Sequence, residues 1–215
     1  MHHDDFKFEP VRGLPEALPA DEQIIWQGAP NPLRLAKDAM KLNWVMGYFV
    51  LLAAVRVIMV SDQMSLTAAM AQGIPFLIAG ILVAAILIGV ATVQARSTVY
   101  TLTNKRACMR IGAALTMTIN LPYVCIGNAQ ASVRKSGIGT ITFAMIGDTR
   151  ISYLMTWPHV RPYHMRKTQP AFRAIPDAAR VAALFADAAE TRVSTPQVAP
   201  VSKVNQTPAN IIAAE

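Results

Sequence analysis

VYTLTNKRACMRIG, residues 99–112, is the stretch that decides the fold. Its side chains alternate between apolar and polar on either side of Asn104 and Lys105, a pattern typical of two antiparallel strands joined by a tight turn. The stretch that follows, LTMTINL at residues 115–121, alternates just as regularly, with Leu, Met and Ile on one face and Thr and Asn on the other. The three segments together predict a half-buried antiparallel sheet.

Four more strands are expected around these. Residues 128–134, 139–145 and 150–156 are separated by KSGIG and GD, which have the glycine and aspartate chemistry that hairpin turns require. Residues 22–30, EQIIWQGAP, have the pattern of a single strand, which is not stable alone, so we expect it to join the sheet as a seventh strand. Residues 157–170 contain three prolines and are therefore expected to form a loop or an edge.

The end of this domain is expected to be helical. The stretch IPDAARVAALFADAAE, residues 175–190, places Pro176 near the first helical position and Val181, Leu184 and Phe185 on one stripe, which should close one end of the sheet. From residue 191 onward the sequence is aperiodic and contains Pro, Ser and Thr, so a disordered tail is expected.

Two long apolar stretches lie upstream of the strands, at residues 42–60 and 74–93. Each is close to the ~20 residues that an α-helix needs to cross about 30 Å of hydrocarbon, and only a helix satisfies its own backbone within one span. They predict an antiparallel transmembrane hairpin joined by residues 61–73. Basic residues flank its two outer ends, whereas the connecting loop carries only Asp62, so the positive-inside rule places both termini in the cytoplasm. Residues 31–41 are expected to run as an amphipathic helix along the membrane surface.

The chain is therefore predicted to be a membrane α+β protein in four parts. These are an N-terminal cytoplasmic segment that contributes one strand to the sheet (residues 1–41), a two-helix transmembrane hairpin (42–93), a cytoplasmic antiparallel β-domain with its C-terminal helix (94–190) and a disordered tail (191–215).

Hydrophobic residues make up 53% of the 215 residues and charged residues 15%, which is more apolar than an ordinary soluble protein. The net charge of +7 is concentrated after residue 93, where 14 Lys and Arg stand against 5 Asp and Glu. Such a surface suits anionic headgroups, an acidic partner or solvent.

Two features stand out inside the predicted spans. Gly80 and Ala84, and likewise Ala85 and Gly89, are small residues four positions apart, which allows another helix to approach closely. That helix belongs either to the hairpin itself or to a partner, including a second copy of the chain. Arg56 is the one charge within a span; intramembrane charges often have a function, but this one lies near the far end, where its side chain reaches the headgroups.

The strongest candidate interaction site is RPYHMRKTQPAFR, residues 161–173. Its basic side chains and the tyrosine between them are Arg161, Tyr163, His164, Arg166, Lys167 and Arg173. Such a cluster on a proline-rich loop suits anionic lipid headgroups, an acidic face of a partner subunit, or solvent alone, because exposed charges are mostly solvated. Nucleic acid is a poor candidate because the chain has a membrane tether and no recognition motif.

No motif in the sequence indicates an enzyme. The serine-elbow, zinc-protease, P-loop and dinucleotide-binding patterns are all absent. His159 and His164 lack Cys or acidic neighbours at metal-ligand spacing. We therefore expect a protein without catalytic activity, metal or cofactor.

Four of these segments resemble the membrane-anchored bacterial pleckstrin-homology-like (PH-like) proteins. They are YTLTNKRACMRIG, INLPYVCI, GTITF and IPDAARVAALF, and they fall within residues 97–190. The resemblance implies a PH-like antiparallel β-barrel or sandwich of seven strands, capped by the C-terminal helix.

Two further segments are similar to the photosynthetic complex assembly proteins of purple phototrophic bacteria. They are DDFKFEPVRGLPEALPADEQIIWQGAP and WPHVRPYHMRKTQPAFRAIPDA, and the similarity extends over nearly the whole chain up to the tail. It implies a non-enzymatic factor in the bacterial inner membrane, cytoplasmic or intracytoplasmic, that assists assembly of the reaction centre and its core light-harvesting antenna. The implied partners are reaction-centre subunits, core antenna polypeptides and other assembly factors.

The histidines bear on whether such a protein would carry pigment. His2, His3, His159 and His164 all lie outside the predicted spans, so none is placed to ligate a chlorophyll magnesium there. The sequence thus agrees with a helper that holds other chains. The alternative is a PH-like module that binds anionic lipid and has no photosynthetic role.

Overall fold

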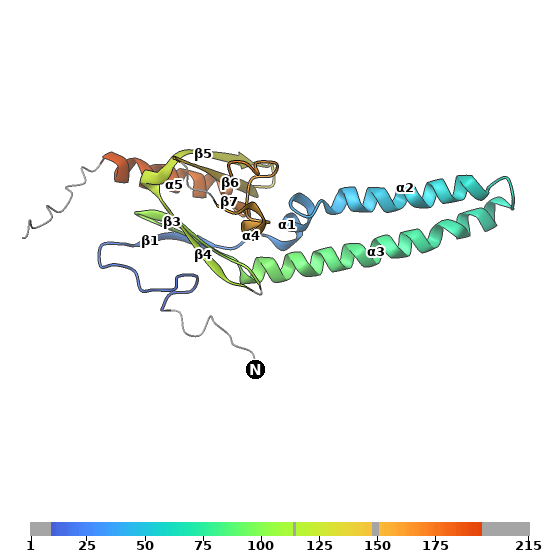
Figure 1. The fold of residues 1–215 in the computed structure, drawn as a ribbon, viewed down its shortest axis with the longest axis horizontal. Coiled ribbons are helices and arrows are strands. Elements are labelled where there is room, and N and C mark those ends of the chain that lie inside the picture. Colours follow the sequence, from blue (N-terminus) through green and yellow to red (C-terminus); the bar gives the residue numbers. More distant parts are fainter. Residues whose placement is uncertain (1–9, 114, 148–150, 195–215) are drawn as a thin grey trace, which may run out of the picture.

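The computed structural model describes residues 10–113, 115–147 and 151–194. The molecule is elongated, with a β-domain at one end and a pair of long helices projecting from it (Figure 1). Residues 1–9 and residues 195–215, which include most of the predicted tail, lie outside the described residues.

Among the described residues, seven antiparallel strands form two sheets. The first has the order β1-β2-β3-β4, built from β1 (Ile24–Gly28), β2 (Val99–Thr103), β3 (Arg106–Ile111) and β4 (Met117–Pro122). The second has the order β5-β6-β7, built from β5 (Ile126–Val133), β6 (Gly139–Met145) and β7 (Ala171–Ile175). The hairpin predicted at residues 99–112 is confirmed, because β2 pairs with β3 across the turn at Asn104 and Lys105.

The N-terminal strand joins the first sheet, as expected. β1 runs antiparallel to β2, with Trp26 opposite Leu102. Just before β1, the carboxylate of Glu22 accepts two hydrogen bonds from the guanidinium of Arg106, at 2.8 and 3.0 Å. The chain segments before and after the long helices are therefore held together in one sheet.

One predicted strand is wrong, and one strand is not predicted. Residues 151–156 form no strand, because after Ser152 the chain makes the single helical turn α4 (Tyr153–Thr156). The Thr156 hydroxyl closes this turn by donating to the Ser152 carbonyl at 2.7 Å. The seventh strand is instead β7, which pairs with β6. All five residues of β7 are buried, so the sequence shows no alternation there.

Helix α5 (Ala178–Ser194) packs on β5, β6 and β1 and on the short 3₁₀ helix η2 (Tyr123–Cys125). It buries Val181, Phe185 and Ala188 in the core that the two sheets share, which confirms the predicted capping helix. It begins later than expected because β7 continues to Ile175, and it ends at Ser194 rather than at residue 190. Within the described residues, hydrogen-bond ladders run inside each sheet and not between the two. The domain is therefore a sandwich, and the closed-barrel alternative is wrong.

Two long helices carry the apolar stretches. α2 (Leu42–Val60) coincides with the first predicted span, whereas α3 (Leu66–Ser97) has 32 residues and extends past the second at both ends. The connecting loop is accordingly shorter than predicted. Both helices are long and apolar enough to cross a membrane. Within the most apolar 18-residue stretch of each helix, only 11% is buried inside the protein. Most of the apolar side chains on these helices are therefore exposed on the outside of the chain.

The short helix α1 (Pro32–Asp38) joins the sandwich to the hairpin. It begins after Asn31, whose side chain accepts a hydrogen bond from the Arg34 amide at 3.0 Å. Leu35, on its buried face, packs with Ala95 of α3 and Ala174 of β7. A helix is therefore present in the predicted segment, but it ends at Asp38 rather than at residue 41, and its buried face contacts the hairpin and the sandwich. Its expected position along the membrane surface stays a prediction.

Candidate interaction surface

The basic stretch singled out in the sequence lies mostly in a long loop between α4 and β7, here called the basic loop (residues 157–170). The two ends of this loop run side by side. Val160 forms an isolated β-bridge with Pro170, and the Arg161 amide donates to the Gln169 carbonyl at 2.9 Å. The predicted loop is confirmed, and its tip projects from a paired stem.

A buried histidine holds the root of the basic loop. The ring of His159 is fully buried, with Nδ1 2.6 Å from the Tyr100 hydroxyl and Nε2 3.1 Å from the Thr98 hydroxyl. Thr98 donates its own proton to the Gln94 carbonyl at 2.7 Å, so it accepts from Nε2–H. Nδ1 must then accept from Tyr100. His159 is therefore the neutral tautomer protonated on Nε2.

Burial keeps this chain of hydrogen bonds uncharged. It lowers the pKa of His159 to about 3, helped by the nearby positive charge of Arg173, and it raises the pKa of Tyr100. Gln94 lies in the last turn of α3. The root of the basic loop is thus fastened to the end of the helical hairpin.

Arg173 belongs to this buried cluster and not to an exposed basic surface. It lies on β7 with only 6% of its surface exposed. Its guanidinium donates to the carbonyls of Pro158 and Val160, at 3.1 and 3.4 Å. Desolvation by burial lowers its pKa. The sequence predicts that Arg173 binds a partner or lipid, but in the structure its side chain is buried and stabilises the start of the basic loop.

The other predicted residues lie nearer the tip. Tyr163, Arg166 and Lys167 are exposed, whereas Arg161 and His164 are half-buried. Arg161 donates to the side-chain oxygens of Gln130 and Gln169, at 3.0 and 3.1 Å, and both of these partners are neutral. No Asp or Glu occurs between residues 151 and 169, so the only formal charges in the segment are positive.

The tip of the basic loop lies where the hairpin leaves the sandwich. The Lys41 ammonium is 5.8 Å from the centre of the Tyr163 ring, within cation–π range, and Lys41 directly precedes α2. A groove of about 520 Å³ has Lys41, Trp44, Arg134 and Arg161 among its lining residues. The basic loop and the first turn of α2 therefore border the same space.

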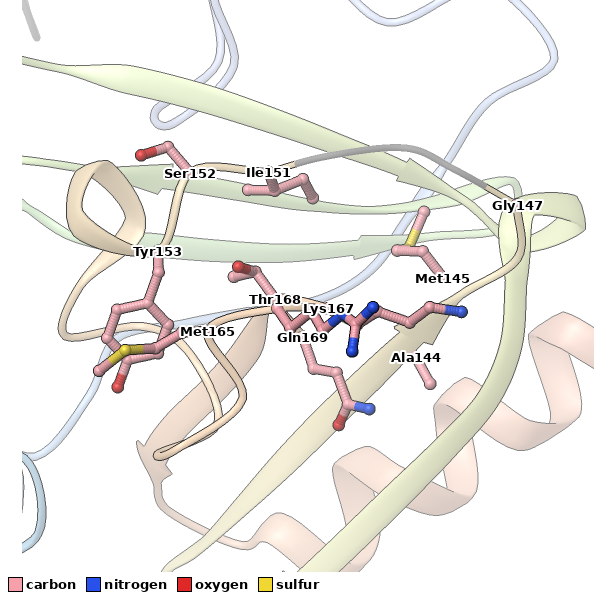
Figure 2. Close-up of a pocket in the computed structure, with 11 residues that line it drawn as sticks. Ala144, Met145, Gly147, Ile151, Ser152, Tyr153, Met165, Lys167, Thr168 and Gln169 are labelled. Atoms are coloured by element: carbon pink, nitrogen blue, oxygen red, sulfur yellow. The ribbon is translucent and has the colours of Figure 1, made fainter.

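A larger cavity, of about 840 Å³, lies between the end of β6, the start of α4 and the basic loop. Figure 2 shows the side chains that surround it. Apolar Met145 and Met165 line it together with Tyr153 and the cations Arg166 and Lys167, and none of the described residues that line it is a carboxylate. In the part of the chain that the structure describes, no group of three or more His, Cys, Asp or Glu could hold a metal ion. The cavity suits a surface or ligand that is both apolar and anionic.

The small residues predicted for helix packing face two directions. A Cβ atom on Gly80 would lie 2.9 Å from Cβ of Phe49 on α2, and Ala84 packs against the buried cluster of Ala36, Met40, Leu42 and Ala91. Ala85 and Gly89 are exposed, and nothing lies within 4 Å of a Cβ built on Gly89. The first pair therefore belongs to the hairpin interface, and the second pair faces outward.

Arg56 is exposed on α2, close to the end of the helix that lies away from the sandwich. That position fits the expectation that its side chain reaches outward rather than into the hairpin.

This division of the small residues gives a prediction with a matched control. Gly80→Leu should disrupt the packing of α2 against α3, because the new side chain would collide with Phe49. We expect it to destabilise the protein by about 1–3 kcal/mol, as overpacking typically does. Gly89→Leu meets open space and should cost nothing. Thermal unfolding of both variants in detergent, followed by circular dichroism, measures the difference; equal destabilisation by the two would contradict the assignment.

Two features of this surface are not predicted from the sequence: the buried hydrogen-bonded cluster around His159, and the exposed apolar pair Leu154 and Met155. In the sequence, His159 lacks neighbours at metal-ligand spacing and has no expected role. Its partners Thr98 and Tyr100 lie about sixty positions earlier, so no local signal reveals the cluster. Leu154 and Met155 are strongly exposed. In the sequence these two apolar residues are adjacent. A strand with one solvent-exposed face would instead alternate apolar and polar residues, so the adjacent pair is the signal against a strand here.

Comparisons with known proteins come from three directions. A family model described as "Bacterial PH domain" matches residues 47–189, which is more than half of the chain. The chain is 38% identical over 205 residues to a protein of Rhodobacter capsulatus named "Uncharacterized 23.7 kDa protein in puhA 5'region", covering 94% of this chain and 96% of that protein. A solved structure of a protein with a pleckstrin-homology domain from Shewanella loihica aligns over 43% of this chain and 71% of its own, at 11% identity and a TM-score of 0.29, too low to carry an argument.

Proposed function

The chain belongs to the bacterial PH domain family, and we propose that it is a membrane-bound, non-enzymatic assembly factor of the PuhB type, which assists assembly of the photosynthetic reaction centre and its core antenna. The observation that carries the proposal is the match, along nearly the full length of both chains, to the Rhodobacter capsulatus protein. That protein's name places its gene in the puhA 5′ region. The gene neighbourhood agrees with the resemblance of the N-terminal segment and the basic loop to photosynthetic assembly proteins.

The architecture supports a scaffold that binds other chains. Both long helices present apolar side chains outward, and α3 presents the small residues Ala85 and Gly89, against which another helix could pack closely. The sandwich presents the basic loop beside the same helices. Transient contacts with reaction-centre subunits, antenna polypeptides or other assembly factors need such surfaces and no catalytic group.

The proposed location is the bacterial inner membrane, with α2 and α3 spanning it and both chain ends in the cytoplasm. Pairing of β1 with β2 supports this topology, because the segments before and after the hairpin must lie on one side of the membrane to share a sheet. The basic residues that flank the hairpin favour the cytoplasmic side. Reporter enzymes fused to each end should both be active only in the cytoplasm; a periplasmic signal from either end would reject the topology.

Removal of the gene tests the function. In a phototrophic host, an in-frame deletion should sharply lower the reaction-centre content of membranes, measured by its absorbance, because subunits would lack their holding partner during assembly. A wild-type copy supplied in trans should restore that content, and the abundance of a respiratory complex should not change. Reaction-centre content equal to that of the parent strain would reject the proposal.

A further inference from the structure

Large apolar side chains are exposed on α4 and the basic loop. They are Leu154, Met155, Trp157, Tyr163 and Met165, with 85%, 66%, 39%, 81% and 70% of their surfaces accessible. Single exposed apolar residues are common on any protein, but a group of this size within one short segment marks an interaction surface.

This segment lies at the end of the sandwich from which the hairpin projects. Its tip touches Lys41, the residue before α2, and its root is bonded through His159 and Thr98 to the last turn of α3. In Figure 1, α4 lies at the end of the sandwich from which the hairpin projects. The turn between β3 and β4 lies at the same end, because β2 starts directly after α3 and pairs there with the end of β3, and this turn exposes Leu115.

The residue types in the segment are those found at a lipid–water boundary. Between residues 151 and 169 the chain has Arg161, Arg166 and Lys167 and no acidic residue. Tryptophan, tyrosine and the long basic side chains favour the headgroup layer, where an apolar part is buried and a polar end stays wet. On α2, Trp44 and Tyr48 are exposed within two turns of Lys41, as an aromatic belt requires.

We propose that α4 and the basic loop up to Lys167, residues 153–167, form an interfacial anchor that inserts its apolar side chains into the headgroup layer of the membrane spanned by the hairpin, with its cations facing anionic lipid. The inference rests on the spanning hairpin of the proposed function. The anchor adds a third attachment beside the two helices. With three attachments the hairpin, and the sandwich fastened to its end, can no longer tilt freely relative to the membrane plane, so the surfaces of the sandwich are presented to partners in one orientation.

Depth measurements on the full chain test the anchor. Cys125 is exposed and is first replaced by serine, whereas Cys108 is buried and can stay. Single cysteines are then introduced as Met155→Cys and Met165→Cys, labelled with a fluorophore, and reconstituted into vesicles of phosphatidylcholine and phosphatidylglycerol. Lipids carrying nitroxides at known depths report how far each label penetrates.

Two controls bracket the result. Leu82→Cys lies on the exposed face in the middle of α3 and should report the bilayer centre. Val124→Cys is also exposed, but its neighbour Tyr123 bonds to Lys105 at the far end of the first sheet, so its label should remain unquenched. We expect the labels at 155 and 165 to lie about 5–10 Å into the headgroup and acyl boundary, as interfacial segments do.

The outcomes separate the anchor from the span. Labels at 155 and 165 that behave like the one at 124, while the label at 82 is quenched, would overturn the anchor and leave the spanning hairpin intact. An unquenched label at 82 would reject the span and, with it, the anchor. Labels at 155 and 165 that stay in water in pure lipid, and become protected only when reaction-centre subunits are present, would assign the surface to a protein partner and overturn the lipid assignment.

Discussion

Replacing Phe172 with alanine is expected to lower the free energy of unfolding by about 3–5 kcal/mol, the usual cost of emptying a buried phenylalanine site. Phe172 lies on β7 and is fully buried. Its ring stacks on Tyr100 with centroids 4.6 Å apart, and it also contacts Trp26 at 6.1 Å and Phe143 at 5.0 Å. These neighbours come from β1, β2 and β6, so the side chain joins the two sheets and its loss would leave a cavity between them.

Near-ultraviolet circular dichroism of the protein in detergent, with increasing denaturant, measures this loss in the sandwich. Tyr163→Ala is the matched control, because it removes an aromatic ring that is 81% exposed and should change stability by no more than about 0.5 kcal/mol. Phe172→Leu should fall between the two. A Phe172→Ala variant no less stable than Tyr163→Ala would show that the two sheets do not depend on this contact.

The sequence predicts segments well where one physical property suffices. The residues of α2 follow from apolar composition alone, and the hairpin of β2 and β3 follows from alternation around a polar turn. The ends of α3 do not follow in the same way. Hydropathy marks the part of a helix that suits lipid, but residues 66–73 and 94–97 remain helical without being strongly apolar.

Strand β7 shows why other parts resist prediction. AFRAI contains an arginine, a residue that is rarely buried without partners. The carbonyls that accept from Arg173 belong to Pro158 and Val160, at the start of the basic loop, and only the folded chain brings them together. The same dependence on distant partners explains why the sequence assigns Arg173 to an exposed cluster. Arg166 and Lys167, whose exposure needs no partner, are placed as expected.

Acidification below pH 6.5 is expected to destabilise the protein through His159. Burial lowers the pKa of His159 to about 3 in the folded state, against 6.5 for an ordinary histidine. Between these values the unfolded chain binds a proton that the folded chain does not, so stability falls as pH falls. The expected slope approaches about 1.4 kcal/mol per pH unit. Above pH 6.5 both states are neutral at this position, and the contribution no longer changes.

The hydrogen-bond directions explain why the folded state resists protonation. Nδ1 accepts from Tyr100, and the Tyr100 oxygen already accepts from the Arg173 amide at 3.2 Å. A proton added to Nδ1 would therefore displace one donor and place a charge beside the Arg173 guanidinium without contact with water. Protonation of His159 would weaken the hydrogen bonds at the root of the basic loop. Acid should therefore release this loop from the end of α3 before the rest of the sandwich unfolds.

His159→Gln separates this effect from general acid unfolding. Glutamine keeps one donor and one acceptor but does not titrate, so the slope between pH 6.5 and 5 should disappear, in a range where ordinary carboxyl groups, with pKa values near 4, hardly change their charge. His164→Gln, outside the buried cluster, should retain the slope. Denaturant midpoints at half-unit pH intervals measure all three proteins, and an unchanged slope in His159→Gln would place the acid sensitivity elsewhere.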